Sequence, residues 1–192
     1  MMRRLLWLGG WILAHGAAVA IATAIDFEIA FALGLEGLLW APLAFGIING
    51  CCIGGVEAWL LRRLWRYPGW WLVATILATP PGIALAVVVL AGLSTSIGPG
   101  QDSLKVFLFG LFVGTVVGIA QYPCLRRHLR RAAMWIAIAG MGRGIGWAAG
   151  FSLVISLNFA SEVTLSAWGG AVGGAIYGFI TGIYLQQTIP TH

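Results

Sequence analysis

Ionisable side chains interrupt three of the apolar stretches of this chain, where almost every other residue is uncharged: His15, Glu57 and Arg143. Such groups are costly in apolar surroundings, and in membrane proteins they pair with one another or mark ion and substrate paths. Other polar groups lie at comparable places in the neighbouring stretches. The sequence therefore predicts one polar intramembrane centre, formed by Glu57, Arg143, Gln121, Thr79, His15 and Thr181.

Glu57 follows Gly54 by three positions, so both lie near one face of a helix. Gln121 and Thr181 hold the equivalent places in two other stretches. A carboxyl, an amide and a hydroxyl at one level can act as a polar clamp between helices. The alternative is a proton or cation site, and both interpretations stay open at this point.

Arg143 lies twelve residues past the basic boundary at Arg131, which is about 18 Å along a helix and close to the membrane midplane. Helical side chains lean toward the helix N-terminus, so Arg143 and Glu57 lean toward each other from opposite sides. We therefore expect them to form an ion pair. That pair is either structural or part of an anion-binding or ion-coupling site. His15 and Thr79 are expected at the same depth as Arg143.

His15 is a candidate ligand for a pigment, because a neutral imidazole can ligate a metal centre. The alternative is a buried, hydrogen-bonded histidine. His128 and His192 lie outside the spans, which argues against a bis-histidine haem. Lipid, chlorophyll and carotenoid are the bound groups that the sequence leaves open.

Pro80 and Pro81 are expected to break the third apolar stretch and to free the carbonyls of Ile76 and Leu77. Broken helices line transporter sites. Prolines also occur in ordinary spans.

Composition identifies the solvent of this protein as lipid. Of 192 residues, 60% are hydrophobic and 9% charged, against about 25% charged in a soluble domain. The net charge of +5 comes from short basic clusters between apolar stretches, which membrane topology explains better than nucleic-acid binding. No Ser/His/Asp set, metal-ligand cluster or carboxylate pair is evident, so we expect no enzyme.

Six apolar stretches are long enough to cross about 30 Å of hydrocarbon: 5–25, 38–61, 69–93, 104–125, 132–157 and 163–185. Asp26 and Glu36 bound a segment expected to be an interfacial connection between the first two. The arginine clusters fall on one side of the spans, which predicts that both termini are cytoplasmic in a bacterial inner (plasma) or thylakoid membrane. Trp7, Trp71 and Trp135 are expected to be interfacial anchors.

An internal repeat organises the spans. Residues 46–82 match residues 110–146 at a shift of 64 positions, and a third copy is divided between the termini. Each copy carries glycine at every fourth position, which lets helix backbones approach closely. The sequence thus predicts an all-α, single-domain membrane protein of six transmembrane helices. Its three circularly permuted helical-hairpin repeats (38–93, 102–157, and 162–192 plus 1–25) are expected to surround a pseudo-threefold axis.

The segment Gln121-Tyr122-Pro123-Cys124-Leu125-Arg126-Arg127, followed by Trp135, resembles a motif of uncharacterised cyanobacterial-type multi-pass membrane proteins. Their form is Gln-Trp-x-x-Leu-Arg-Arg with a following tryptophan. The resemblance covers about two thirds of the chain, with Glu57 in place of the glutamine in the first copy and Tyr122 in place of the tryptophan in the second. It implies the helical-hairpin architecture and a thylakoid or plasma membrane, with no assigned reaction.

The leading hypothesis is therefore a non-enzymatic accessory or scaffold subunit of a larger membrane complex, in contact with membrane lipid and other integral subunits and not with nucleic acid. The alternative is a small-solute or ion transporter or channel that uses the polar centre. A sensor membrane module is a third hypothesis.

Overall fold

The computed structural model describes residues 2–33, 41–62, 64–66, 68–93, 97, 100–156 and 162–188, and these are almost entirely helical. The helices are α1 (Met2–Leu33), α2 (Ala41–Leu61), α3 (Gly69–Leu93), α4 (Asp102–Leu125), α5 (Met134–Ser156) and α6 (Glu162–Leu185), and a short 3-10 helix, η1 (Gln186–Thr188), follows. All six long helices are long and apolar enough to cross a membrane. The prediction of an all-helical chain with six helices that are long and apolar enough to span a membrane is confirmed for the described residues.

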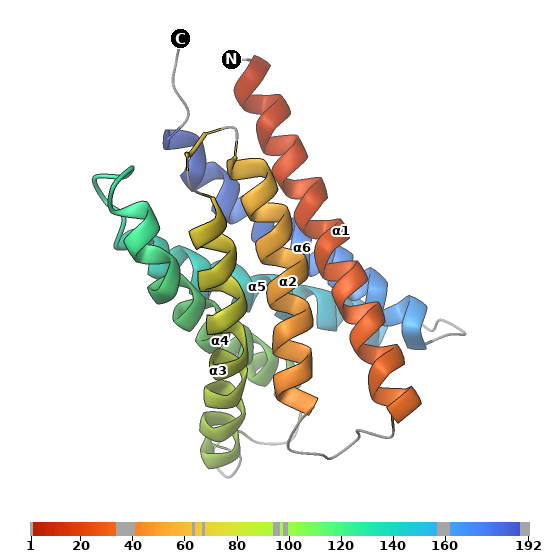
Figure 1. The fold of residues 1–192 in the computed structure, drawn as a ribbon. Helices are drawn as coiled ribbons and strands as arrows, with labels where there is room; N and C mark the ends of the chain where they lie inside the picture. Colours follow the sequence, from red (N-terminus) through yellow and green to blue (C-terminus); the bar gives the residue numbers. More distant parts are fainter. Residues whose placement is uncertain are drawn as a thin grey trace.

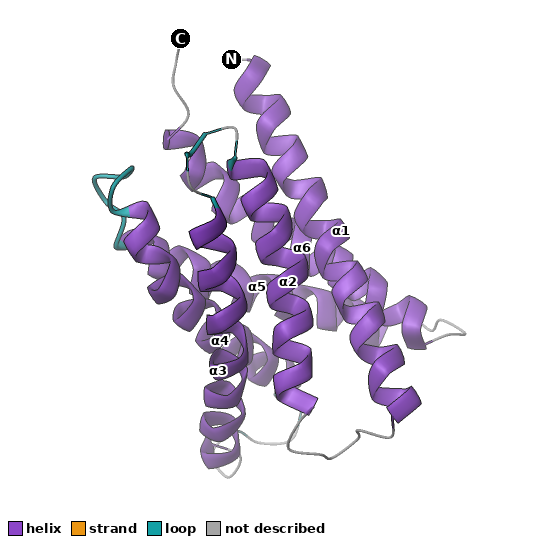
Figure 2. Cartoon of the chain, in the orientation of Figure 1, coloured by secondary structure: helices purple, strands orange, loops and turns teal. Residues whose placement is uncertain are grey.

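The helices form a closed ring. Each packs against the next along the chain, and α1 packs against α6. The most extensive contacts join α4 with α5, α1 with α6 and α2 with α3. The start of α1 and the end of α6 lie at the same end of the molecule (Figure 1), and the described turns lie at the ends of the helices (Figure 2).

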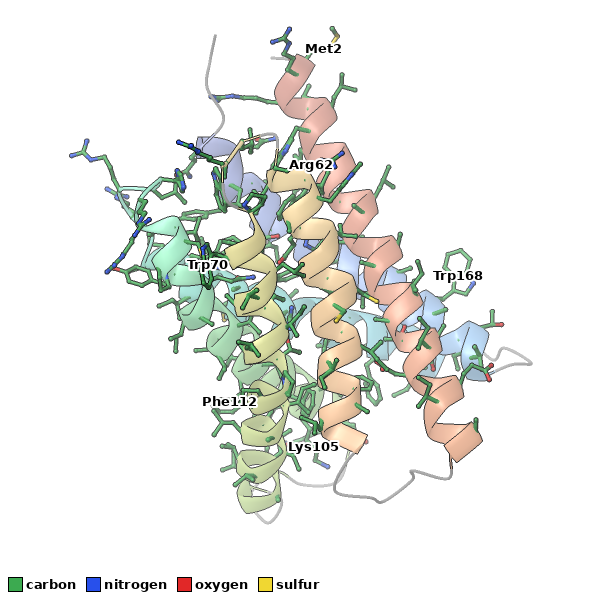
Figure 3. The ribbon with its side chains drawn as sticks, in the orientation of Figure 1. Met2, Arg62, Trp70, Lys105, Phe112 and Trp168 are labelled. Carbon is green, nitrogen blue, oxygen red and sulfur yellow. The ribbon has the colours of Figure 1, made fainter. Side chains whose placement is uncertain are left out.

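One end of the molecule is basic. Met2 and Arg62 lie there, together with the arginine-rich turns that join α2 to α3 and α4 to α5, whereas Lys105 lies at the opposite end (Figure 3). Lys105 is ion-paired with Asp102, 3.0 Å away. Glu36 and Arg63 lie outside the described residues. This basic end is the arginine-rich end of the molecule, and its cytoplasmic orientation stays a prediction.

The first helix is longer than the sequence suggests. The sequence predicted an interfacial connection from Asp26 onward. This prediction is wrong for residues 26–33, because α1 continues to Leu33. Asp26 is 6% exposed, and its carboxylate accepts a hydrogen bond from the Asn49 side chain of α2. That neighbouring donor gives one oxygen of the carboxyl group a buried partner, at a point where the sequence alone suggested that the span ends.

The expected break at Pro80 and Pro81 is also wrong, because α3 runs without interruption from Gly69 to Leu93. The backbone of α2 lies directly against this point. A Cβ added at Gly46 would come within 2.6 Å of the Pro80 Cα. The two prolines therefore lie inside a continuous helix that is packed against its neighbour, as prolines in membrane spans often do.

Glycines bring α4 and α5 together at the level of their backbones. A Cβ added at Gly114 would overlap the carbonyl oxygen of Ala139 and lie 2.9 Å from the Cα of Gly140. Such proximity allows dispersion contacts that lipid tails cannot replace. Gly55, in contrast, has nothing within 4 Å of an added Cβ.

We expect Gly114→Ala to lower the free energy of unfolding by about 1–3 kcal/mol, because the added methyl must separate α4 from α5. Unfolding with sodium dodecyl sulfate in mixed micelles, followed by circular dichroism, measures the change. Gly55→Ala is the matched control and should leave stability unchanged or slightly raised. Equal losses in the two variants would show that the α4–α5 contact is looser than described.

Candidate functional site

The centre of the site is the carboxylate of Glu57 on α2, which is fully buried. Its Oε2 accepts hydrogen bonds from Trp71 Nε1 at 2.7 Å and from Gln121 Nε2 at 3.2 Å. Its Oε1 lies 3.0 Å from His15 Nε2 and accepts from the Tyr177 hydroxyl at 3.4 Å. These four partners come from α3, α4, α1 and α6. One carboxylate thus joins five of the six helices.

The hydrogen bond from a buried indole N–H group to a polar side chain occurs three times in the structure. Three buried indole N–H groups each donate to a polar side chain: Trp71 to Glu57 at 2.7 Å, Trp135 to Gln121 at 2.8 Å, and Trp11 to Thr181 at 3.1 Å. The first two pairs are each separated by 14 residues along the chain. The geometry of a helix, an arginine-rich turn and the next helix therefore brings an indole to the same place twice.

The expectation that Trp71 and Trp135 anchor the membrane interface is wrong, because both side chains are 0% exposed. Their indole side chains lie in the interior of the helix bundle, and their N–H groups donate to buried acceptors. Trp7 is not the third member of this set. It stacks on Trp11, with ring centroids 5.0 Å apart, and Trp11 makes the hydrogen bond.

The indole bonds also fix which residues lie at one level. His15 follows Trp11 by four positions, as Thr75 follows Trp71. Arg143, in contrast, follows Trp135 by eight positions. The predicted alignment of His15 with Thr79 and Arg143 is therefore wrong by about one helical turn, and His15 lies level with Thr75.

His15 has both ring nitrogens engaged. Nδ1 lies 2.8 Å from the Trp11 carbonyl oxygen, which can only accept, so Nδ1 carries a hydrogen. Nε2 and Glu57 Oε1 then share one further proton. The three other donors, from Trp71, Gln121 and Tyr177, complete the hydrogen bonding of the two Glu57 oxygens. Because neither nitrogen is free, the structure does not support His15 as a pigment ligand.

Gln121 uses both ends of its amide. Nε2 donates to Glu57 and, at 2.9 Å, to Thr75 Oγ1, while Oε1 accepts from Trp135. The Thr75 hydroxyl in turn donates to the Trp71 carbonyl at 2.9 Å. The amide orientation is therefore determined by its neighbours on three helices.

Arg143 on α5 is buried, at 2% exposure, but the expected ion pair with Glu57 is wrong. Its guanidinium carbon lies 5.2 Å from the centroid of the Tyr177 ring. The same tyrosine gives its hydroxyl to Glu57, so Tyr177 contacts both residues. Arg143 Nη1 and Nη2 have no hydrogen-bond partner among the described residues. The structure thus places a cation–π contact where the sequence suggested a salt bridge.

The two threonines of the predicted centre make separate contacts. Thr181 accepts from Trp11 and donates to the Tyr177 carbonyl at 2.7 Å. Thr79 donates to the Thr75 carbonyl at 2.7 Å and does not reach the carboxylate. Of the six predicted residues, the structure brings together Glu57, His15 and Gln121 by direct hydrogen bonds.

Five residues of the network escaped sequence reasoning: Trp11, Trp71, Thr75, Trp135 and Tyr177. The 14-residue spacing that recurs in Glu57/Trp71 and Gln121/Trp135 was a usable signal for two of them. Tyr177 had none, because the matching positions in the other copies are Ile53 and Val117.

Metal binding finds no support in the described part of the chain, where no three His, Cys, Asp or Glu side chains gather as a metal site requires. The three cysteines are free. Neither family models, curated proteins nor solved structures match this chain.

We expect strong energetic coupling between His15 and Glu57 and weaker coupling between Arg143 and Glu57. A double-mutant cycle with His15→Leu and Glu57→Gln should give an interaction energy within the range of about 0.5–3 kcal/mol found for contacting groups. The cycle with Arg143→Met and Glu57→Gln should give a smaller value, because Tyr177 lies between the two. Detergent unfolding of the five variants measures both cycles. A larger energy for the arginine cycle would mean that the two charges meet directly.

Proposed function

We propose that the protein is a non-enzymatic accessory or scaffold subunit of a larger membrane complex. The observation that carries this proposal is the full engagement of the Glu57 carboxylate. Trp71, Gln121 and Tyr177 direct three donors at its two oxygens, His15 shares a proton with it, and every one of these side chains is buried. A carboxylate held in this way is suited to fixing helices and not to exchanging ions or attacking a substrate.

The outer surface supports the same proposal. Large apolar side chains are exposed along all six helices, where they meet lipid or the helices of a partner. Trp168 on α6 projects outward and is 56% exposed (Figure 3). Trp59 on α2 is 50% exposed. A rigid core with a broad apolar exterior suits a subunit that packs against other integral subunits.

A pseudo-threefold arrangement of three hairpin-like repeats belongs to this proposal. The three indole hydrogen bonds of Trp71, Trp135 and Trp11 support it, as does the pairing of α2 with α3, α4 with α5 and α6 with α1. Such a body offers three similar outer faces to neighbouring subunits.

Purification in a mild detergent from the native membrane tests the proposal. We expect one or more integral membrane proteins to co-purify in fixed ratio, identified by mass spectrometry after cross-linking. Trp168→Ala and Trp59→Ala should lower recovery if their faces form the contact, while the body stays folded. A protein recovered strictly as a monomer, with no partner above the level of an unrelated tagged six-helix control, would contradict the proposal.

An anion transporter or channel is the second candidate function, and Arg143 is the observation in its favour. The His15–Glu57 pair is neutral overall whichever residue carries the shared proton, so it does not compensate the positive charge of Arg143. Two guanidinium nitrogens also have no hydrogen-bond partner among the described residues. Buried charges in membranes are normally paired or face water, and a small anion would satisfy both needs.

Anion binding at Arg143 predicts a specific response to salt. Raising chloride or nitrate at constant ionic strength, with gluconate as the replacement anion, should raise the melting temperature of the wild-type protein. Arg143→Met should abolish the increase, and Arg130→Gln, at the arginine-rich end, should retain it. An equal rise in the melting temperature of both variants would show that no anion binds at Arg143. Anion flux into proteoliposomes tests transport itself.

A further inference from the structure

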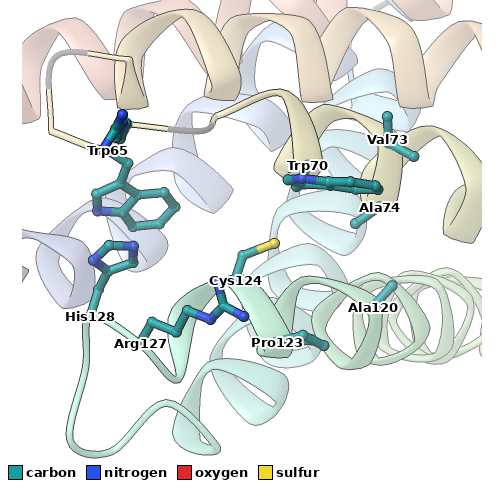
Figure 4. A pocket seen from close by; sticks show the side chains of 10 residues that line it. Trp65, Trp70, Val73, Ala74, Ala120, Pro123, Cys124, Arg127 and His128 are labelled. Atoms are coloured by element: carbon teal, nitrogen blue, oxygen red, sulfur yellow. The ribbon is translucent and has the colours of Figure 1, made fainter.

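A cavity of about 690 Å³ opens between α3 and α4 at the arginine-rich end (Figure 4). Trp65 and Arg66 reach it from the turn after α2, and Arg127 and His128 from the turn after α4. The two helices provide the remaining walls. The cavity lies apart from the buried network around Glu57, and none of that network's hydrogen-bonding residues lines it.

One wall of the cavity is fixed by aromatic stacking. Trp65 stacks on His128 with ring centroids 4.9 Å apart and an interplanar angle of 4°. It also meets Trp71 edge-on, with centroids 5.3 Å apart. Trp71 is bonded to Glu57, so this wall is tied to the rigid centre of the protein. A site built on such a wall has its shape before any ligand arrives.

The opposite ends of the cavity differ in chemistry. Arg66 and Arg127 supply positive charge and hydrogen-bond donors at the arginine-rich end, and the His128 ring lies on the same side of the cavity. Val73 and Ala74 of α3 and Ala120 of α4 line the other end, away from Trp65 and His128 (Figure 4). The cavity is therefore basic toward the end of the bundle and apolar toward the membrane interior.

This polarity matches a phospholipid. Guanidinium groups bind phosphate oxygens through paired, charge-assisted hydrogen bonds. Trp70 lines the cavity and is 70% exposed, and exposed indoles are typical of the level of lipid head groups. Basic pockets between transmembrane helices on the cytoplasmic side bind anionic lipid head groups. The volume lies in the range of about 300–1,000 Å³ of small-molecule sites, sufficient for a head group, its glycerol and the first methylenes.

We propose that this cavity binds one anionic phospholipid of the leaflet facing the arginine-rich end. Its phosphate lies between Arg66 and Arg127, and an acyl chain follows Val73, Ala74 and Ala120. The proposal stands whether or not the protein is a subunit of a larger complex, because it depends on the cavity and not on a partner protein.

The internal repeat provides a matched control. Arg130 occupies the place that Arg66 holds in the first copy, but its surroundings differ. In the second copy, Leu129 replaces Trp65 and Met134 replaces Trp70. The residue that corresponds to Arg127 in the next copy is the uncharged Gln187. Removing Arg130 therefore takes one arginine from the same end of the protein without touching the cavity.

Native mass spectrometry of the delipidated protein in mild detergent tests the proposal. Phosphatidylglycerol and phosphatidylcholine with identical acyl chains are added in turn. We expect one phosphatidylglycerol to be retained about tenfold more tightly than phosphatidylcholine. Arg66→Gln and Arg127→Gln should each weaken its retention about tenfold, the effect of losing one charge-assisted contact. Arg130→Gln should retain it as the wild type does, and unchanged melting temperatures without lipid establish that the variants fold.

Three results would overturn the proposal. One is equal retention of the two lipids. Another is an equal loss of phosphatidylglycerol in Arg127→Gln and Arg130→Gln, which would mean that net charge and not the cavity attracts the lipid. The last is full displacement of the lipid by millimolar inorganic phosphate, which would identify the occupant as a free anion.

Discussion

Burial of one carboxyl group, that of Glu57, is the constraint on which the rest of this structure depends. Taking a carboxylate out of water costs several kcal/mol even after the protein relaxes, and lipid offers no donor in exchange. Glu57 recovers this cost through His15, Trp71, Gln121 and Tyr177. These partners belong to four other helices, so the hydrogen bonds of Glu57 can all form only when the five helices lie together in this arrangement. The network thereby supplies the specificity that apolar contacts between helices in lipid do not.

The positions of the packing glycines and of the buried polar side chains are linked in this chain. Glu57, Gln121 and Thr181 each follow a glycine by three positions: Gly54, Gly118 and Gly178. A Cβ at these glycines would come within 2.9 Å of Thr75 Cβ, 3.0 Å of Ile136 Cα and 3.0 Å of His15 Cβ, respectively. Because the glycine brings the adjacent helix close, the polar side chain one turn later can reach an indole on that helix. A larger residue at the glycine would lengthen the hydrogen bond as well as loosen the packing.

Apolar length and charge position were enough to predict six spans, because each run is long and its ends are marked by arginines or acidic residues. Position within a span also identified Glu57, Gln121 and His15 as buried polar groups. The side chains that these buried polar groups contact could not be predicted in the same way. Whether Arg143 meets a carboxylate or an aromatic face depends on Tyr177, whose place has no polar equivalent in the other copies. Helix continuation past Asp26 likewise depends on a donor from α2, which local sequence does not reveal.

The pairing of α1 with α6 joins the first and last spans of the chain. Trp11 and Thr181, which share a hydrogen bond, are 170 residues apart. At ribosomal rates of about 5–20 residues per second, the first span waits on the order of ten to thirty seconds in the membrane before its partner is made. During that interval Glu57 lacks the hydroxyl of Tyr177, and the indole of Trp11 lacks its acceptor. Until α6 is in place, the polar centre therefore lacks the hydrogen bonds that Tyr177 and Thr181 supply.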